Sequence, residues 1–118
     1  MKLVYVAGPY RAKTAWEVEQ NVRRAEEWCL KIAHYGHAPV CVHTMYRFFH
    51  KLKDDQFWID ATLALLQRCD ASIFIEGWRD SEGSLGENKE ARRLKLPIWE
   101  WPGDEDPHGL WLMRLEHG

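Results

Sequence analysis

Four short apolar runs, separated by longer segments with helical periodicity, constrain this sequence more than any other feature. The runs cover residues 2–7, 38–43, 70–76 and 96–101 and are rich in β-branched and aromatic residues, which is typical of buried strands. Strands that alternate with helices build βαβ units and a mostly parallel sheet. We therefore predict one α/β domain over residues 1–118, a flavodoxin- or Rossmann-like three-layer sandwich with four or five strands.

The segments between these runs carry helix signals. Thr14 and Glu17 have the spacing of a capping box, and Gly36 is a typical residue just beyond a helix end. One apolar face of this first helix is formed by Ala15, Val18, Val22, Ala25, Cys29 and Ile32. Further helices are predicted over 55–68, with Asp55 as N-cap, and over 86–94. The tail, residues 102–118, is predicted to hold one short helix.

Charge and cysteine content exclude several classes of protein. Sixteen basic and eighteen acidic residues give a net charge of −2, which is no footprint for a nucleic acid polymer or an anionic membrane. No apolar run has the length of a membrane span or a signal peptide. Cys29, Cys41 and Cys69 lack metal-ligand spacing, so we predict buried, reduced thiols. The expectation is a soluble protein of the reducing cytoplasm, without a metal or cofactor.

Three polar segments follow the first three predicted strands, and parallel strands bind ligands at that edge. In "AGPYR", Gly8 allows close approach of the backbone, Pro9 stiffens the turn, Tyr10 adjoins them, and Arg11 is suited to a phosphate. The alternative is an ordinary turn with a solvated arginine. His43, in "VHT", is either a pocket residue or a plain hydrogen-bonded histidine. The three segments together predict one small-molecule site.

The third segment, "GWRDSEGSLGENKEARR", raises the question of what Glu87 does. Ser84 and Glu87 match a capping box, so Glu87 is either part of a helix cap or a reactive carboxylate. Ser81, Gly83 and Ser84 beside a helix N-terminus predict a phosphate site, and the helix dipole is expected to keep Glu87 ionised near neutral pH. An ionised carboxylate is suited to attack on an anomeric carbon. Trp78 is expected to wall the pocket or to stack on a base.

These segments, in this order, resemble the nucleoside 2-deoxyribosyltransferase-like superfamily, and most closely a small branch from phages and bacteria, largely of unknown function. The resemblance covers about residues 3–99. It is carried by "YVAGPYR", Asn21, Ala25, "GHAPVCVHT", Phe57, Trp58, "LLQRCDA", and "GWRDSEGSLGENKEA" followed by "LPI". The last long segment has the form S-x-G-x-x-x-E-x-x-x-A.

The resemblance implies cleavage of the N-glycosidic bond of a nucleoside or nucleoside 5′-monophosphate. The residue that matches Glu87 attacks C1′ and forms a glycosyl-enzyme, which water or a second base then resolves. The residues that match Ser81 and Gly83 hold the 5′-group, and the glycine that matches Gly8 lies close to the ligand. A homodimer is also implied, and "RFFHKL" (47–52) and "GLWLM" (109–113) are candidate contact segments.

One position departs from the family pattern. Relatives carry an aspartate, eight residues before the aspartate of "CD", that assists departure of the base. With Asp70 as the reference, that position is Thr62. Asp60 lies about 200° away around a helix, and it is either solvated or turned into the cleft. Asp60 or His43 is therefore the candidate to assist the base.

The leading hypothesis is an N-glycosidase or N-deoxyribosyltransferase in which Glu87 is the nucleophile. The serines and glycine of its loop favour hydrolysis of a 5′-monophosphate over transfer. The first alternative, motivated by Thr62, is a nucleotide-binding or sensor module without chemistry. The second is a structural subunit whose tryptophan-rich surface serves assembly.

Overall fold

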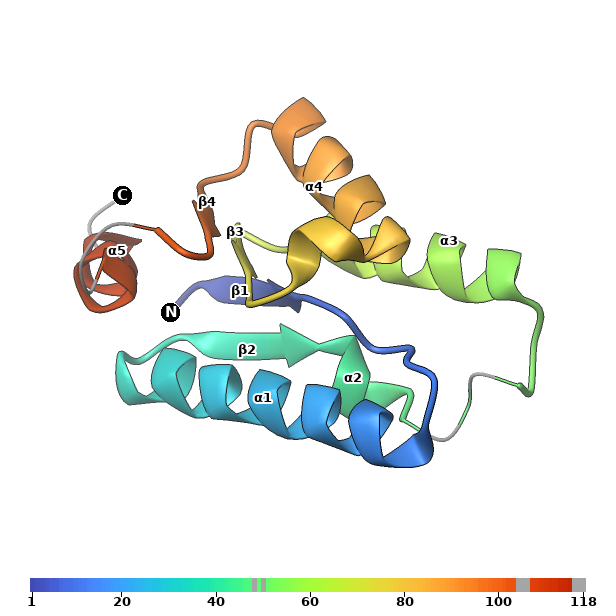
Figure 1. Ribbon diagram of the computed structural model, residues 1–118. Coiled ribbons are helices and arrows are strands. Elements are labelled where there is room, and N and C mark those ends of the chain that lie inside the picture. The colour runs from blue at the N-terminus through green and yellow to red at the C-terminus, as the bar shows by residue number, and fades with distance from the viewer. Residues whose placement is uncertain (48, 50, 104–106, 116–118) are drawn as a thin grey trace.

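A four-stranded, all-parallel sheet organises the protein (Figure 1), with the strand order β2-β1-β3-β4. The computed structural model describes residues 1–47, 49, 51–103 and 107–115. The elements are β1 (Leu3–Ala7), α1 (Ala15–His34), β2 (Ala38–Cys41), α2 (Val42–Met45), α3 (Asp55–Leu66), β3 (Ala71–Phe74), the 3-10 turn η1 (Trp78–Asp80), α4 (Glu82–Arg93), β4 (Ile98–Glu100) and α5 (Pro107–Leu115). The predicted flavodoxin-like α/β fold is confirmed.

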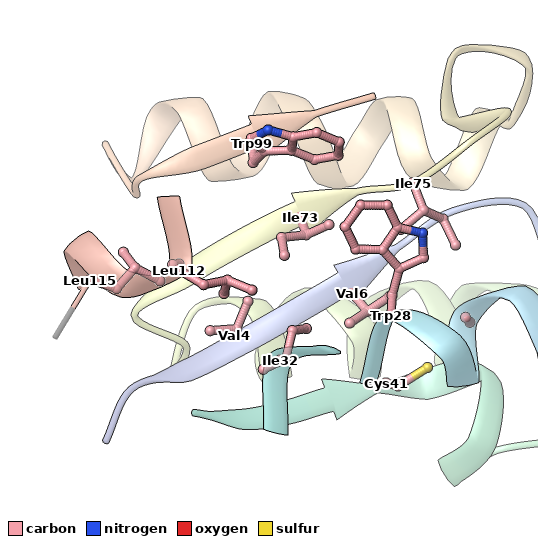
Figure 2. Close-up of a cluster of buried hydrophobic side chains, with 12 residues drawn as sticks. Val4, Val6, Trp28, Ile32, Cys41, Ile73, Ile75, Trp99, Leu112 and Leu115 are labelled. Carbon is pink, nitrogen blue, oxygen red and sulfur yellow. The ribbon is translucent and has the colours of Figure 1, made fainter. Parts of the chain in front are cut away.

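Two apolar clusters, one on each face of the sheet, make the three layers. On one face α1 and α5 pack against the strands, and Figure 2 shows Trp28, Ile32 and Trp99 in this cluster with Val4 and Val6 of β1. On the other face α3 and α4 cover the sheet (Figure 1). Alternate residues of β1 therefore face opposite layers, which explains why its run is apolar throughout.

The first helix has the ends that the sequence predicts. The Thr14 side chain accepts a hydrogen bond from the Glu17 backbone N–H at 3.1 Å, as an N-cap does. Gly36 follows the helix with φ +85°, a conformation that favours glycine. The predicted apolar face needs two corrections, because Ala15 is exposed and Trp28, not foreseen, is buried in the core.

The second predicted strand is wrong at its end. The β2 strand stops at Cys41, and the short helix α2 follows, closed by the bond from Tyr46 N–H to the Val42 carbonyl at 2.9 Å. His43 is therefore a residue of α2 and not of a strand end. A short apolar run does not distinguish a strand from the first turn of a buried helix, because both bury apolar residues.

Two helix starts also differ from the predictions. Asp54 caps α3, accepting from the Phe57 N–H at 2.8 Å, so Asp55 already lies in the helix. The α4 helix begins at Glu82, four residues before the predicted start, and Ser81 is its N-cap. The Ser84–Glu87 capping box is therefore wrong. Adjacent aspartates and two serines three residues apart offer equivalent caps, and only the path of the chain selects one.

The remaining predicted elements are confirmed with shorter ends. The predicted helix in the tail is α5, and Leu112 and Leu115 anchor it in the core. His37 holds it as well, since its Nε2 lies 2.8 Å from the Leu112 carbonyl oxygen. In the candidate dimer segments, Phe49 and Leu52 are exposed, while Phe48 and His50 and the side chains of residues 109 and 110 lie outside the described part.

Two further predictions concern the state of the cysteines and the presence of a membrane span. Cys41 and Cys69 are buried, Cys29 is partly buried, and all three thiols are free. Among the residues that the structure describes, no helix is long and apolar enough to cross a membrane.

Candidate functional site

A cavity of about 740 Å³ opens at the carboxyl ends of β1 and β3. This is the edge at which an open parallel sheet binds ligands, and the volume suits a nucleoside-sized molecule. Four parts of the chain line the cavity. The segment after β1 contributes Gly8, Pro9, Tyr10 and Arg11, and the α2 region contributes Val42, His43 and Tyr46. The α3 helix contributes Asp55, Trp58, Ile59, Thr62 and Leu63, and η1 with α4 contributes Asp80, Ser81, Glu82, Gly83, Ser84, Gly86 and Glu87. The three polar segments thus meet, as the sequence predicts.

Glu87 lies in the second turn of α4, on the face that also carries the buried Ser84 and Ala91. This face packs toward β1, where the Tyr5 hydroxyl donates a hydrogen bond to Glu87 Oε2. Burial raises the pKa of Tyr5 well above its usual value, so the phenol stays a neutral donor. A buried donor on a rigid strand therefore fixes the Glu87 carboxyl group at the cavity.

The protonation of Glu87 differs from the prediction. Burial raises its pKa from 4.5 to about 7, although the Tyr5 hydrogen bond and the charge of His43 lower it. The expectation that the helix dipole keeps Glu87 ionised near neutral pH is therefore met only in part, because a group with this pKa is about half ionised there. The field of a helix N-terminus acts within the first turn, and Glu87 lies beyond it, where burial dominates.

His43 is buried, and its ring holds the segment after β1. Its Nε2 lies 3.1 Å from the Gly8 carbonyl oxygen and 3.0 Å from that of Pro9. Because carbonyl oxygens only accept, Nε2 carries the proton and donates. Its Nδ1 lies 3.7 Å from Cys41 Sγ. Burial lowers the pKa of His43, but its interactions with Cys41, Pro9 and Glu87 have a larger effect in the opposite direction, so the pKa is raised overall. Both ring nitrogens are thus occupied, and His43 positions the loop.

Gly8 lines the cavity, but its packing explains the glycine. A Cβ at this position would lie 2.4 Å from Cγ1 and 2.9 Å from Cδ1 of Ile75, the residue that follows β3. No carbon atoms pack that closely, so any side chain forces Ile75 or the loop to move. Close approach of a ligand is not needed to explain the residue.

We expect Gly8→Ala to lower the free energy of unfolding by about 2 kcal/mol, the usual cost of overpacking a core. Urea denaturation followed by circular dichroism measures it. Gly86→Ala is the matched control, since a Cβ there meets nothing within 4 Å and the mid-helix change should stabilise by about 0.5–1 kcal/mol. Equal stability of the two variants would contradict the proposed clash.

Tyr10 and Arg11 are both bound to neighbouring elements. The Tyr10 hydroxyl donates to the Arg47 carbonyl oxygen, and the Tyr10 carbonyl accepts from Asn21 Nδ2 at 3.1 Å. Arg11 forms a two-point ion pair with Asp55, with Nη2–Oδ1 at 2.6 Å and Nη1–Oδ2 at 3.3 Å. Arg11 is thus not a lone solvated arginine, and a phosphate at its guanidinium would share it with the Asp55 carboxylate.

The serines and glycine of the third segment line the cavity as predicted, but with different roles. Ser81 Oγ accepts from the Ser84 N–H at 3.2 Å, so it serves as the helix cap. Ser84 is buried, and its Oγ has no hydrogen-bond partner among the described residues. Buried hydroxyl groups are nearly always bonded, so Ser84 is a candidate contact for a ligand.

Two predicted site residues lie elsewhere. Asp60 is exposed, accepts a hydrogen bond from Gln56 Nε2 at 2.8 Å, and is not in the cavity wall. Cavity-facing residues of α3 recur at 55, 58, 59, 62 and 63, and Asp60 falls on the opposite side. Trp78 does not wall the cavity either: it packs on Phe74, donates to the Trp101 carbonyl at 3.1 Å and lies under the Arg79 guanidinium.

Sequence reasoning missed several functional candidates. The sequence pattern does not single out Tyr5, although a tyrosine in a buried strand needs a hydrogen-bond partner for its hydroxyl, and this need points to a role. Tyr46 and Trp58 form a tilted aromatic pair in the cavity wall, with ring centroids 4.9 Å apart. Asp80 and Glu82 line its mouth. Within the described part of the chain, no three His, Cys, Asp or Glu side chains could hold a metal ion.

The protein is thus a parallel α/β sandwich with a partly buried, tyrosine-bound glutamate in a cavity at the carboxyl edge of its sheet. Residues 2–101 match the domain of unknown function DUF7768, and the chain belongs to that family. The matched segment contains every residue of the cavity wall, whereas α5 follows it. A comparison with curated proteins gives no match.

Proposed function

We propose that the protein cleaves the N-glycosidic bond of a nucleoside or nucleotide through a covalent intermediate on Glu87. The observation that carries this proposal is the Glu87 carboxyl group, held by Tyr5 at a cavity of nucleoside size. With a pKa of about 7, half of these groups are ionised at neutral pH. A positioned carboxylate is the group that retaining glycosidases use as nucleophile.

The chemistry requires two displacements. A Glu87 carboxylate oxygen attacks C1′ while the bond from C1′ to the base nitrogen breaks, and its electron pair leaves with the base. Water then attacks C1′ and loses a proton, the ester bond to Glu87 breaks, and the sugar is released with retained configuration, while a base that departs as an anion takes up one proton. Ser84 Oγ, which lacks a partner among the described residues, is a candidate donor to a sugar hydroxyl.

The test is a panel of ribo- and deoxyribonucleosides and their 5′-monophosphates, incubated with the protein and separated by chromatography. Base release that Glu87→Gln abolishes supports the proposal. Base release that is undiminished in the variant would overturn the proposal. The proposal would also be overturned if the protein released no base from any of these substrates or from other N-glycosides with charged bases.

A second candidate is a nucleotide-binding module without chemistry. The observation that favours it is Thr62 on the cavity face of α3, while Asp60 is exposed on the other side. This reading predicts a ligand-induced rise in melting temperature that survives Glu87→Gln, together with no product after long incubation. The absence of any nucleotide-dependent shift would favour the structural subunit.

The Tyr5→Phe variant tests how Glu87 is tuned. Since the Tyr5 hydroxyl stabilises the ionised carboxylate, its loss should raise the Glu87 pKa by roughly one unit above its value of about 7. Activity needs the ionised form, so the midpoint at which kcat/KM falls on acidification should move to higher pH. Tyr10→Phe, whose hydroxyl bonds the Arg47 carbonyl, should leave that midpoint in place. Identical midpoints in all three proteins would contradict the role of Tyr5.

The proposal includes a homodimer that is located in the cytoplasm. The exposed apolar side chains Phe49, Leu52 and Phe57 lie in and beside one candidate contact segment, and such side chains favour association. Three free thiols are compatible with a reducing compartment. Analytical ultracentrifugation that shows only monomer would remove the dimer.

A further inference from the structure

The charges around the cavity are mostly negative. Asp55, Asp80, Glu82 and Glu87 line it, and Arg11 is the one guanidinium or ammonium group among the lining residues that the structure describes. Asp55 already engages Arg11 through both carboxylate oxygens. Exposed carboxyl groups are ionised at neutral pH, and walls of one sign concentrate ions of the other. The cavity therefore attracts a cation and repels a phosphate.

The start of α4 and His43 offset this charge only in part. The first turn of α4 carries the Glu82 carboxylate, and its Ser84 N–H already donates to Ser81 Oγ. His43 is able to carry a positive charge, but its Nε2 donates to the Gly8 and Pro9 carbonyls and its Nδ1 faces Cys41. No N–H of the ring is left for an anion.

One wall of the cavity is suited to a flat cation. Tyr46 and Trp58 lie side by side there, and aromatic faces attract cations. Two buried polar atoms of the same cavity, Trp58 Nε1 and Ser84 Oγ, have no hydrogen-bond partner in the described part of the protein. Such atoms usually find one, so a ligand with hydrogen-bonding groups fits this wall.

The face of α3 that lines the cavity offers no free acid. Its carboxylate, Asp55, is held by Arg11, and the Thr62 hydroxyl donates to the Ile59 carbonyl at 2.9 Å. Asp60 is exposed on the far side of the helix. An uncharged base leaves as an anion and needs a proton from such an acid, whereas a cationic base leaves neutral and needs none.

From these observations we infer the substrate class: N-glycosides whose base carries a positive charge, such as pyridinium or N-alkylated purine nucleosides, without a 5′-phosphate. This inference rests on the proposed function and names its substrate. Glu87 attacks C1′, and the electron pair of the broken C1′–N bond neutralises the base cation. Water then releases the sugar, and one proton appears in solution for each bond cleaved.

The experiment compares matched bases. Nicotinamide riboside and 7-methylguanosine are the cationic probes, guanosine and inosine the uncharged ones, and guanosine 5′-monophosphate the anionic one. After division by the uncatalysed rate of each compound, kcat/KM should be at least 100-fold higher for the cationic probes. Equal or higher values for the uncharged or phosphorylated probes would overturn the inference while leaving the proposed function standing. Base release from no probe would overturn the inference, and the proposed function falls as well if the full panel of ribo- and deoxyribonucleosides and their 5′-monophosphates gives none.

Two variants sharpen the test. Thr62→Asp places a carboxyl group on the cavity face of α3, and it should raise kcat for guanosine at least tenfold more than kcat for 7-methylguanosine. Thr62→Asn controls for shape. In Glu87→Gln, where cleavage is blocked, 7-methylguanosine should still bind at least threefold more tightly than guanosine, and salt should reduce the difference. Equal affinities at low salt would count against the inference.

Discussion

Replacing Glu87 with glutamine is expected to lower base release by at least roughly a thousandfold, the scale seen when a catalytic nucleophile is removed. Glutamine keeps the size of the side chain and its hydrogen bond with Tyr5, but a neutral amide does not form an ester with C1′. The loss should therefore appear in kcat, with the melting temperature unimpaired. Steady-state kinetics on the best substrate of the panel measures it.

Two controls separate a nucleophile from a positioning residue. Asp60→Asn changes an exposed carboxylate outside the cavity, and activity should stay within a factor of two. In Glu87→Ala, azide should restore base release and yield a glycosyl azide, because the small anion occupies the space of the missing carboxylate. Full activity in Glu87→Gln, or loss of activity without azide rescue, would count against covalent catalysis by Glu87.

The same residue is expected to govern how stability changes with pH. The folded-state pKa of Glu87 is about 7, against 4.5 in an unfolded chain, so the folded state holds the proton more tightly. Its contribution is fully present below pH 4.5 and is lost as the pH rises to about 7. The loss amounts to about 3 kcal/mol above neutrality. The free energy of unfolding of Glu87→Gln should therefore rise by that amount relative to the wild type when the pH is raised from 4 to 8.

Urea unfolding of both proteins at these two pH values gives the difference directly. Tyr5, Cys41 and His43 face Glu87 and are present in both proteins, so their own titration largely cancels. Glu90→Gln is the matched control on the same helix, since the pKa of Glu90 is lowered by its bonds to Arg93 and Gln67. That variant should show no gain at pH 8. A pH-independent difference for Glu87→Gln would refute the raised pKa.

Such a gain would mean that the cavity holds Glu87 at a cost to stability. Reactive groups are often kept in environments that do not favour their charged form, because the same environment raises their reactivity toward a bound ligand. A cationic base beside Glu87 would offset this cost by favouring the carboxylate. The pKa of Glu87 should accordingly fall when a cationic ligand binds, whereas an uncharged ligand lacks this effect.

Much of the fold was predictable from local pattern. The runs around β1 and β3 are mostly apolar because both faces of a parallel strand are buried, and Thr14 and Gly36 bracket α1 through capping chemistry that acts over a few residues. The start of α4 was not predictable, because Ser81 and Ser84 are equivalent caps in sequence. The position at which β2 ends was not predictable for a similar reason, since Val42 and His43 suit a buried helical turn as well as a strand.

The alternation of four strands with longer helices can be derived from the sequence pattern, and so can the meeting of the segments that contain Gly8, His43 and Glu87 at one edge of the sheet. That follows because parallel strands end on the same side. The bond between Tyr5 and Glu87, the ion pair between Asp55 and Arg11, and the position of Asp60 and Trp78 outside the cavity are visible in the folded molecule alone. These contacts join residues distant in sequence, and which side of a helix meets them depends on packing that no local pattern specifies.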